Sequence, residues 1–171
     1  LRETELRVHA IADVHATLYS QHQLSHLPLA DYARDLISDM QIAYRSEADI
    51  LVESDLSTEA HIDFAISFGI ILNELITNAA KHGATTNEQA QIKVNLSEQE
   101  DGLVLVVNDS GSGFGEDFTA GIGTEVVDQL VRQNHGTIER RSECGAVVRV
   151  TFPSSSVARD QPVRVMEGQS A

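Results

Sequence analysis

Residues 68–83, FGIILNELITNAAKHG, are the stretch from which both the fold and the site of this chain can be predicted. Apolar residues recur there at helical spacing without a proline, so we expect a long helix over about 62–83 that ends at Gly83. Its buried side is expected to comprise Ile70, Ile71, Leu75, Ile76 and Ala79. Its polar residues are three or four positions apart, which predicts one shared face with Glu74, Asn78, Lys81 and His82. An amide, a carboxylate and cations on one face are typical of a site for metal and phosphate.

The composition indicates one soluble domain with an acidic surface. The 171 residues include 12 basic and 26 acidic ones, a formal net charge of −14, which argues against nucleic acid and against direct membrane contact. A nucleotide ligand would therefore need local cations, helix N-termini or a metal. Cys144 is the single cysteine, so we expect a reduced, cytoplasmic protein in which it is a small hydrophobe beside a strand. No run approaches the roughly 20 apolar residues of a membrane span, and the initial Leu1 suggests a piece of a longer protein.

The remaining periodicities predict helices on one side and a sheet on the other. We expect helices over 1–23, 29–45 and 124–133, the last capped by Gly136, and strands over 48–53, 91–96, 103–108, 137–141 and 146–152. The apolar set expected for the second helix is Leu29, Tyr32, Leu36, Met40 and Ile42 or Ala43. The predicted fold class is α+β, a two-layer α/β sandwich with an antiparallel or mixed sheet. It divides into an N-terminal helical segment (1–27), a main domain (28–153) and a disordered tail (154–171).

The helix over 62–83 carries the first of three chemical clusters. The neutral amide oxygen of Asn78 suits Mg²⁺, which prefers oxygen ligands. Glu74 could act as a general base or orient a metal-bound water, while Lys81 and His82 could meet phosphate oxygens. The same residues also fit a plain helix on which Asn78 bonds locally and the charged side chains are solvated.

The other two clusters are rich in glycine. In NDSGSGF, residues 108–114, the carboxylate of Asp109 could accept a hydrogen bond from the amino group of adenine, and the glycines allow close ligand approach. Gly121-Ile122-Gly123 leads into a helix at Thr124, and such a helix start can bind an anion. Taken singly, these clusters are equally compatible with a flexible turn and an ordinary helix start.

The order of the three clusters resembles the GHKL superfamily of ATP-binding domains, which includes gyrase, histidine kinases and MutL. The N-box is similar to residues 73–82, and the two glycine boxes are similar to 109–113 and 121–123. Residues 1–45 resemble the second helix of the dimerisation and phosphotransfer hairpin of bacterial sensor histidine kinases, with its linker. The chain resembles a subclass close to the HWE kinases rather than those kinases themselves, since Asn73 stands where the HWE kinases carry a histidine.

The resemblance implies the ATP-binding catalytic domain of a two-component sensor histidine kinase. Such an enzyme transfers the γ-phosphoryl group of ATP, with Mg²⁺, to a histidine for relay to a response regulator receiver domain. Asn78 would be the metal ligand, Asp109 the adenine anchor and Glu74 the catalytic base. The other nucleotide contacts implied are Asn73, Lys81, His82, Gly111, Gly113, Phe114, Gly121, Ile122, Gly123 and Thr124.

Three departures from the family pattern shape the expectation. Neither His9 nor His15 stands in an acceptor motif, so the fragment is expected to lack its own phosphoacceptor, although its N-terminal helix would form a homodimer in the parent protein. Only residues 115–120 separate Phe114 from Gly121, which predicts a short lid over the nucleotide and a modest affinity for ATP. Where the family often has a threonine near adenine, this chain has Ala146, which has no hydroxyl to bond the base. Two alternatives stay open: an anti-sigma-type GHKL serine kinase, and a non-catalytic phosphotransfer or scaffold module of the same fold.

Overall fold

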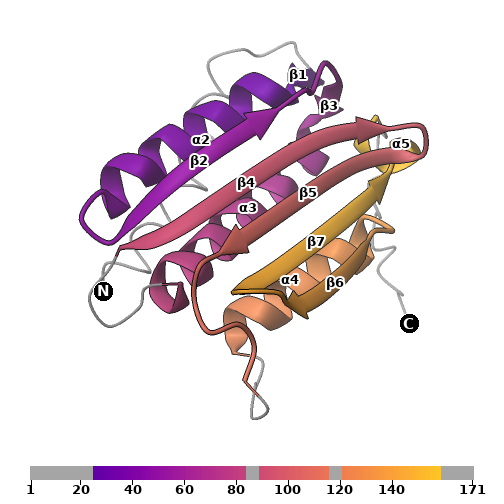
Figure 1. The fold of residues 1–171 in the computed structure, drawn as a ribbon. Helices are drawn as coiled ribbons and strands as arrows, with labels where there is room; N and C mark the ends of the chain where they lie inside the picture. The colour runs from indigo at the N-terminus through magenta and orange to yellow at the C-terminus, as the bar shows by residue number, and fades with distance from the viewer. Residues whose placement is uncertain (1–24, 84–88, 116–120, 159–171) are drawn as a thin grey trace, which may run out of the picture.

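The computed structural model describes residues 25–83, 89–115 and 121–158 (Figure 1). The predicted helix over 1–23, with His9 and His15, lies outside the described residues, as do residues 116–120 of the predicted lid. The described elements are β1 (His26–Pro28), α2 (Leu29–Tyr44), β2 (Ala48–Ser54), β3 (Glu59–His61), α3 (Ile62–His82), β4 (Ala90–Gln99), β5 (Gly102–Asp109), α4 (Ile122–Gln133), β6 (Thr137–Ser142), β7 (Ala146–Pro153) and α5 (Ser154–Val157).

The main sheet confirms the predicted α+β sandwich. Its strand order is β2-β4-β5-β7-β6, with β2 parallel to β4 and every other neighbouring pair antiparallel, so the sheet is mixed. Helices α2, α3 and α4 all cover one face, as Figure 1 shows. The hairpins β4–β5 and β6–β7 join strands that follow one another in the sequence. The arrangement leaves the C-terminal end of α3 beside the end of β5, which is where the candidate site forms.

Helix α3 lies at the centre of the helical layer. It packs against α2, α4 and the sheet, so residues around its whole circumference are buried, among them Phe64, Phe68 and Ile71. By length and composition α3 could cross a membrane, a possibility that the sequence analysis did not anticipate, but 67% of its most apolar window is buried within the domain. Its apolar character is accounted for by this core position.

Helix α2 packs with a stripe that matches the predicted one at Leu29 and Met40 and departs from it at Ile42. Its buried residues are Leu29, Ala33, Ile37, Met40 and Tyr44. Tyr32 and Leu36 are only partly buried, whereas Ile42 is 67% exposed. The correction follows from helical phase, because Ile42 is rotated by about 200° from the buried Met40.

A second, two-stranded sheet was not predicted. Strand β1 pairs antiparallel with β3, placing His26 opposite His61, in two segments for which no strand was predicted. The backbone N–H of Ile62 donates to the carbonyl of Ser25 (3.0 Å), and that of Leu29 donates to Thr58 (3.2 Å). These bonds hold the starts of α2 and α3 together. Strands of three residues are too short to leave a periodic signal in the sequence.

Two further expectations are corrected at the C-terminal end. The tail was expected from residue 154, but Ser154–Val157 form helix α5, in which Ser156 and Val157 are buried. The folded domain therefore extends beyond Pro153, anchored by a bond from the Ser154 N–H to the Asp101 carbonyl (3.1 Å). Cys144 is exposed in the β6–β7 turn with a φ of 52°, and is not a hydrophobe packed beside a strand.

Candidate functional site

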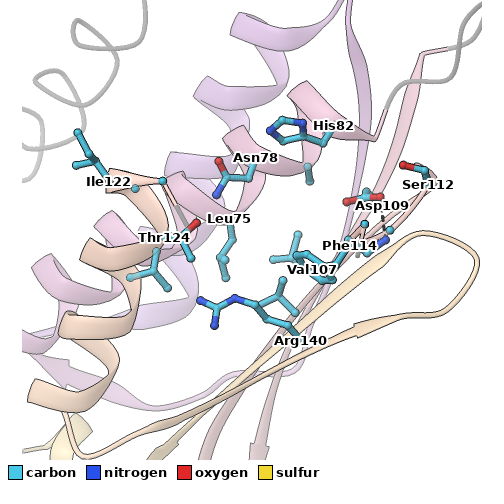
Figure 2. Close-up of a pocket in the computed structure, with 18 residues that line it drawn as sticks. Leu75, Asn78, His82, Val107, Asp109, Ser112, Phe114, Ile122, Thr124 and Arg140 are labelled. Atoms are coloured by element: carbon cyan, nitrogen blue, oxygen red, sulfur yellow. Dashed lines mark hydrogen bonds between the residues drawn. The ribbon is translucent and has the colours of Figure 1, made fainter. Parts of the chain in front are cut away.

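A pocket of about 700 Å³ opens between the end of α3, the end of β5, the start of α4 and the strands β6 and β7 (Figure 2). This volume is typical of a site for a small organic ligand. The lining residues are Leu75, Asn78, Ala79, His82, Val107, Asp109, Ser112, Gly113, Phe114, Gly115, Gly121, Ile122, Gly123, Thr124, Val127, Arg140, Ala146 and Val148.

The face that α3 turns to the pocket differs from the predicted one. Leu75, Asn78, Ala79 and His82 line it, a stripe with the i, i+3, i+4, i+7 spacing of one helical face. Asn78 is half-buried, and Figure 2 shows its side-chain amide among the labelled residues of the cavity. Glu74 is only 3% exposed and does not line the pocket, because one residue of helix rotates it about 100° from Leu75.

The carboxylate of Asp109 is fixed by backbone donors. Its Oδ1 atom accepts bonds from the N–H groups of Gly111 (2.8 Å) and Ala146 (3.1 Å), and the residue is 7% exposed. A Cβ on Gly145 would lie 1.8 Å from the Asp109 carbonyl oxygen, and Gly145 has a φ of +137°, so this position requires glycine. Both of these bonds are made to Oδ1, and Asp109 also lines the pocket.

Hydroxyl groups anchor the glycine-rich loop after β5. Ser110 Oγ donates to the Gly83 carbonyl (3.1 Å) and accepts from the Gln91 N–H (3.0 Å), which ties the loop to the end of α3 and the start of β4. Ser142 Oγ accepts from the Phe114 N–H (2.9 Å) at the start of the lid. The loop is therefore held at both ends, at Ser110 and at Phe114, rather than left as a free turn.

The start of α4 supplies backbone donors. Gly121 is the N-cap residue, and among the described residues no side chain accepts a hydrogen bond from the first N–H groups of the helix. The 12-residue helix presents the positive end of its dipole to the pocket. Ile122 is 75% exposed at this rim, and Thr124 lines the wall. The predicted anion-binding helix start therefore borders the same cavity as Asp109.

Nine of the predicted site residues line this pocket: Asn78, His82, Asp109, Gly113, Phe114, Gly121, Ile122, Gly123 and Thr124. Four do not: Asn73 and Glu74, which are buried in the body of α3, Lys81, which is exposed, and Gly111, which instead donates to Asp109. The roles implied for all of these residues stay predictions.

Sequence reasoning missed the floor of the pocket. Leu75, Val107, Val127 and Val148 supply apolar walls from four different elements, and Arg140 of β6 adds a cation. The Arg140 guanidinium is paired with the Asp128 carboxylate of α4, and both side chains are partly buried. The available signal was the alternation along β6, which directs Ile138 and Arg140 to the helical side of the sheet.

One cavity is surrounded by a core helix with an amide, an acidic strand end and a glycine-rich helix start. This combination is that of an ATPase-type nucleotide-binding domain. The chain belongs to the family of histidine kinase-, DNA gyrase B- and HSP90-like ATPases, whose model matches residues 65–156. A second model, described as histidine kinase, matches residues 1–44 and so extends over β1 and α2. These matches confirm the family predicted from the N-box, the glycine boxes and the N-terminal segment.

Two curated relatives are similar along most of this chain. Blue-light-activated histidine kinase 1 of Erythrobacter litoralis (strain HTCC2594) is 26% identical over 125 residues, 70% of this chain and 35% of that protein. Sensor histidine kinase YvrG of Bacillus subtilis (strain 168) is 27% identical over 176 residues, 72% of this chain and 30% of that protein. The chain thus spans about a third of the length of these relatives.

Solved structures share the fold. The histidine kinase domain of the Erythrobacter litoralis EL346 blue-light activated histidine kinase matches with a TM-score of 0.80 at 21% identity, covering 90% of this chain and 75% of that one. The catalytic domain of histidine kinase ThkA matches with a TM-score of 0.66 at 19% identity, covering 77% of this chain and 96% of that one. At these identities the likeness concerns the fold alone.

Proposed function

We propose that this chain is the ATP-binding catalytic module of a sensor histidine kinase, which transfers the γ-phosphoryl group of ATP to a histidine for relay to a response regulator receiver domain. Supporting this proposal, Asn78, Asp109 and the Gly121–Gly123 turn line one cavity although they lie far apart in the chain. Family membership gives the ATPase class, and the match over residues 1–44 favours a histidine kinase among its members.

The pocket offers a separate chemical environment for each part of a nucleotide. Apolar side chains from the floor suit a planar base, and the Oδ2 atom of Asp109 suits its exocyclic amino group. The N–H groups at the start of α4, together with His82, suit the phosphates. Catalysis would consist mainly of positioning and of charge neutralisation at the transferred group, as is general for phosphoryl transfer.

Magnesium fits the donor set at the proposed phosphate end. The amide oxygen of Asn78 is an oxygen ligand that adds no charge, and Mg²⁺ typically completes its shell with water and substrate phosphates. Bound there, the ion would neutralise the phosphate charge against a chain of formal charge −14. Glu74, the proposed base, is buried beside this face and could act on a bound ligand only through a rearrangement or an intervening group.

We further propose that the chain carries no phosphoacceptor of its own and that its N-terminal segment forms the dimer contact in the parent protein. Neither His9 nor His15 stands in the family acceptor motif, but both lie within the segment that matches the histidine kinase model. The test is mass spectrometry after incubation with ATP and Mg²⁺. Acid-labile phosphate on either histidine would overturn this part of the proposal.

Nucleotide binding is tested by calorimetric titration with a non-hydrolysable ATP analogue, with and without Mg²⁺. We expect binding that strengthens with Mg²⁺. Absence of binding at millimolar analogue would overturn the proposal and favour the scaffold module. Phosphorylation of a partner serine, with none on histidine, would favour the anti-sigma-type serine kinase.

A further inference from the structure

Arg140 occupies a position in the pocket that no motif of the family resemblance covers. It lies on the helical side of β6, and its register partner Val148 pairs in turn with Val107, so the three residues form one row across the sheet floor. Asp109 is two residues beyond Val107 on β5, and therefore on the same face. Arg140 and Asp109 thus border the same apolar floor from different strands.

The position of Arg140 separates it from the proposed phosphate end. In Figure 2, Arg140 and His82 lie at opposite ends of the labelled set, with Leu75 and Asn78 between them. Leu75 precedes His82 by seven residues of α3, which is about 10 Å along the helix axis. Along the floor the neighbours of Arg140 are the apolar Val148 and Val107, which suit a nucleoside better than a phosphate chain. Its partner Asp128 is six residues beyond Ile122, about 9 Å along α4 from the helix start proposed for the phosphates.

The pairing with Asp128 points the same way. The Asp128 carboxylate balances the positive charge of the guanidinium, which weakens its attraction for a distant phosphate. A guanidinium has five N–H donors, and among the described residues Asp128 is the only acceptor that Arg140 reaches with one of them. Donors therefore remain for a neutral acceptor in the pocket, and Asp128 restricts the direction in which they point.

We propose that Arg140, oriented by Asp128, donates a hydrogen bond to the nucleoside half of a purine nucleotide and complements Asp109, which accepts from the exocyclic amino group. This inference rests on the proposed function and assigns a specificity-determining residue to its site. Arg140 would contact the ligand directly, and Asp128 would be a positioning residue. A purine nucleoside presents both a donor amino group and acceptor atoms on its ring and ribose, so the two residues together would recognise it.

The test compares three ligands: adenosine, ADP and a non-hydrolysable ATP analogue, the first followed by NMR titration and the others by calorimetry. In R140M we expect the affinity for all three to fall by a similar factor of about 10, because one charge-assisted bond to their common part is lost. R140K keeps the charge opposite Asp128 but not the planar fork of the guanidinium. Its affinity for the three ligands should fall nearly as far as that of R140M. In D128N the affinity should fall by a smaller factor, again the same for the three ligands.

R141M is the matched control, since Arg141 is the next residue of β6, is exposed on the other face and pairs with Glu139. It should bind all three ligands as the unaltered chain does. A loss in R140M that grows with the number of phosphates would assign Arg140 to the phosphates and overturn the inference. Full affinity in R140K would overturn the requirement for a guanidinium at this position. Equal affinity in R140M and R141M would also overturn it. Failure of the unaltered chain to bind any of the ligands would instead overturn the proposed function.

Discussion

Replacement of Asp109 by asparagine or alanine separates its proposed binding role from its structural one. In the structure one carboxylate oxygen, Oδ1, accepts two backbone N–H groups, from Gly111 and Ala146. The amide oxygen of D109N can accept both bonds, so we expect a folded domain with nearly unchanged stability. Its amide nitrogen would then replace the second carboxylate oxygen, presenting a donor where the base amino group also donates.

The magnitudes follow from these bonds. A hydrogen bond to a charged group is worth about 1.5–3 kcal/mol, so D109N should weaken nucleotide binding by roughly 10- to 150-fold. D109A removes the carboxylate and leaves the two backbone N–H groups without their acceptor at a position only 7% exposed. It should therefore lower the unfolding free energy by about 2–4 kcal/mol. For a domain of this size that corresponds to a fall in Tm of about 5–15 °C.

The assays are calorimetric titration with ADP and urea unfolding followed by circular dichroism. D101N is the control, because it makes the same change of charge at an exposed residue of the β4–β5 turn, and it should alter neither measurement. Unchanged ADP affinity in D109N would remove Asp109 from the ligand site. Equal stability of D109A and D109N would refute the structural argument, even if binding were lost in both.

Three further predictions concern the metal, the α2–α3 contact and the loop before β3. N78A should weaken ATP-analogue binding more with Mg²⁺ than without it, whereas equal calorimetric losses in both conditions would remove Asn78 as a metal ligand. A Cβ on Gly69 would lie 2.1 Å from the Tyr32 hydroxyl oxygen, so G69A should cost about 1–3 kcal/mol in urea unfolding. That hydroxyl is buried, which raises the pKa of Tyr32, and has no partner among the described residues. Y32F should therefore be neutral or stabilising and should partly rescue G69A; an additive double variant would contradict this. The Glu98 carboxylate accepts from the backbone N–H groups of residues 57 and 58 (2.7 and 2.6 Å). E98A should therefore lower the unfolding free energy by about 1–2 kcal/mol, and E98Q by less. Equal unfolding free energies for the two variants would count against this anchor.

The ends of elements show where sequence reasoning succeeded and where it did not. The helix over 62–83 was predicted closely because its apolar periodicity is long. Gly136 was predicted to cap α4, and its N–H does donate to the carbonyl of Val131 (2.8 Å) at the helix end, but the left-handed residue there is His135, with a φ of 54°. A Cβ on Gly136 would lie 2.7 Å from the carbonyl oxygen of Thr151. The glycine is therefore explained by close packing against β7, a contact between elements that no local pattern encodes.

The sequence by itself determined the fold class, the family and nine of the eighteen pocket residues, because these depend on local periodicity and on motifs whose spacing is fixed along the chain. The tertiary structure alone decided which face of α3 lines the pocket, because the phase in which the helix packs buries Glu74 and directs Leu75, about 100° further round, into the cavity. It also decided that Arg140 joins the site, since β6 reaches the pocket only through its pairing with β7 and its contact with α4. Such positions depend on how separate elements pack against one another, and that packing is set by the whole core.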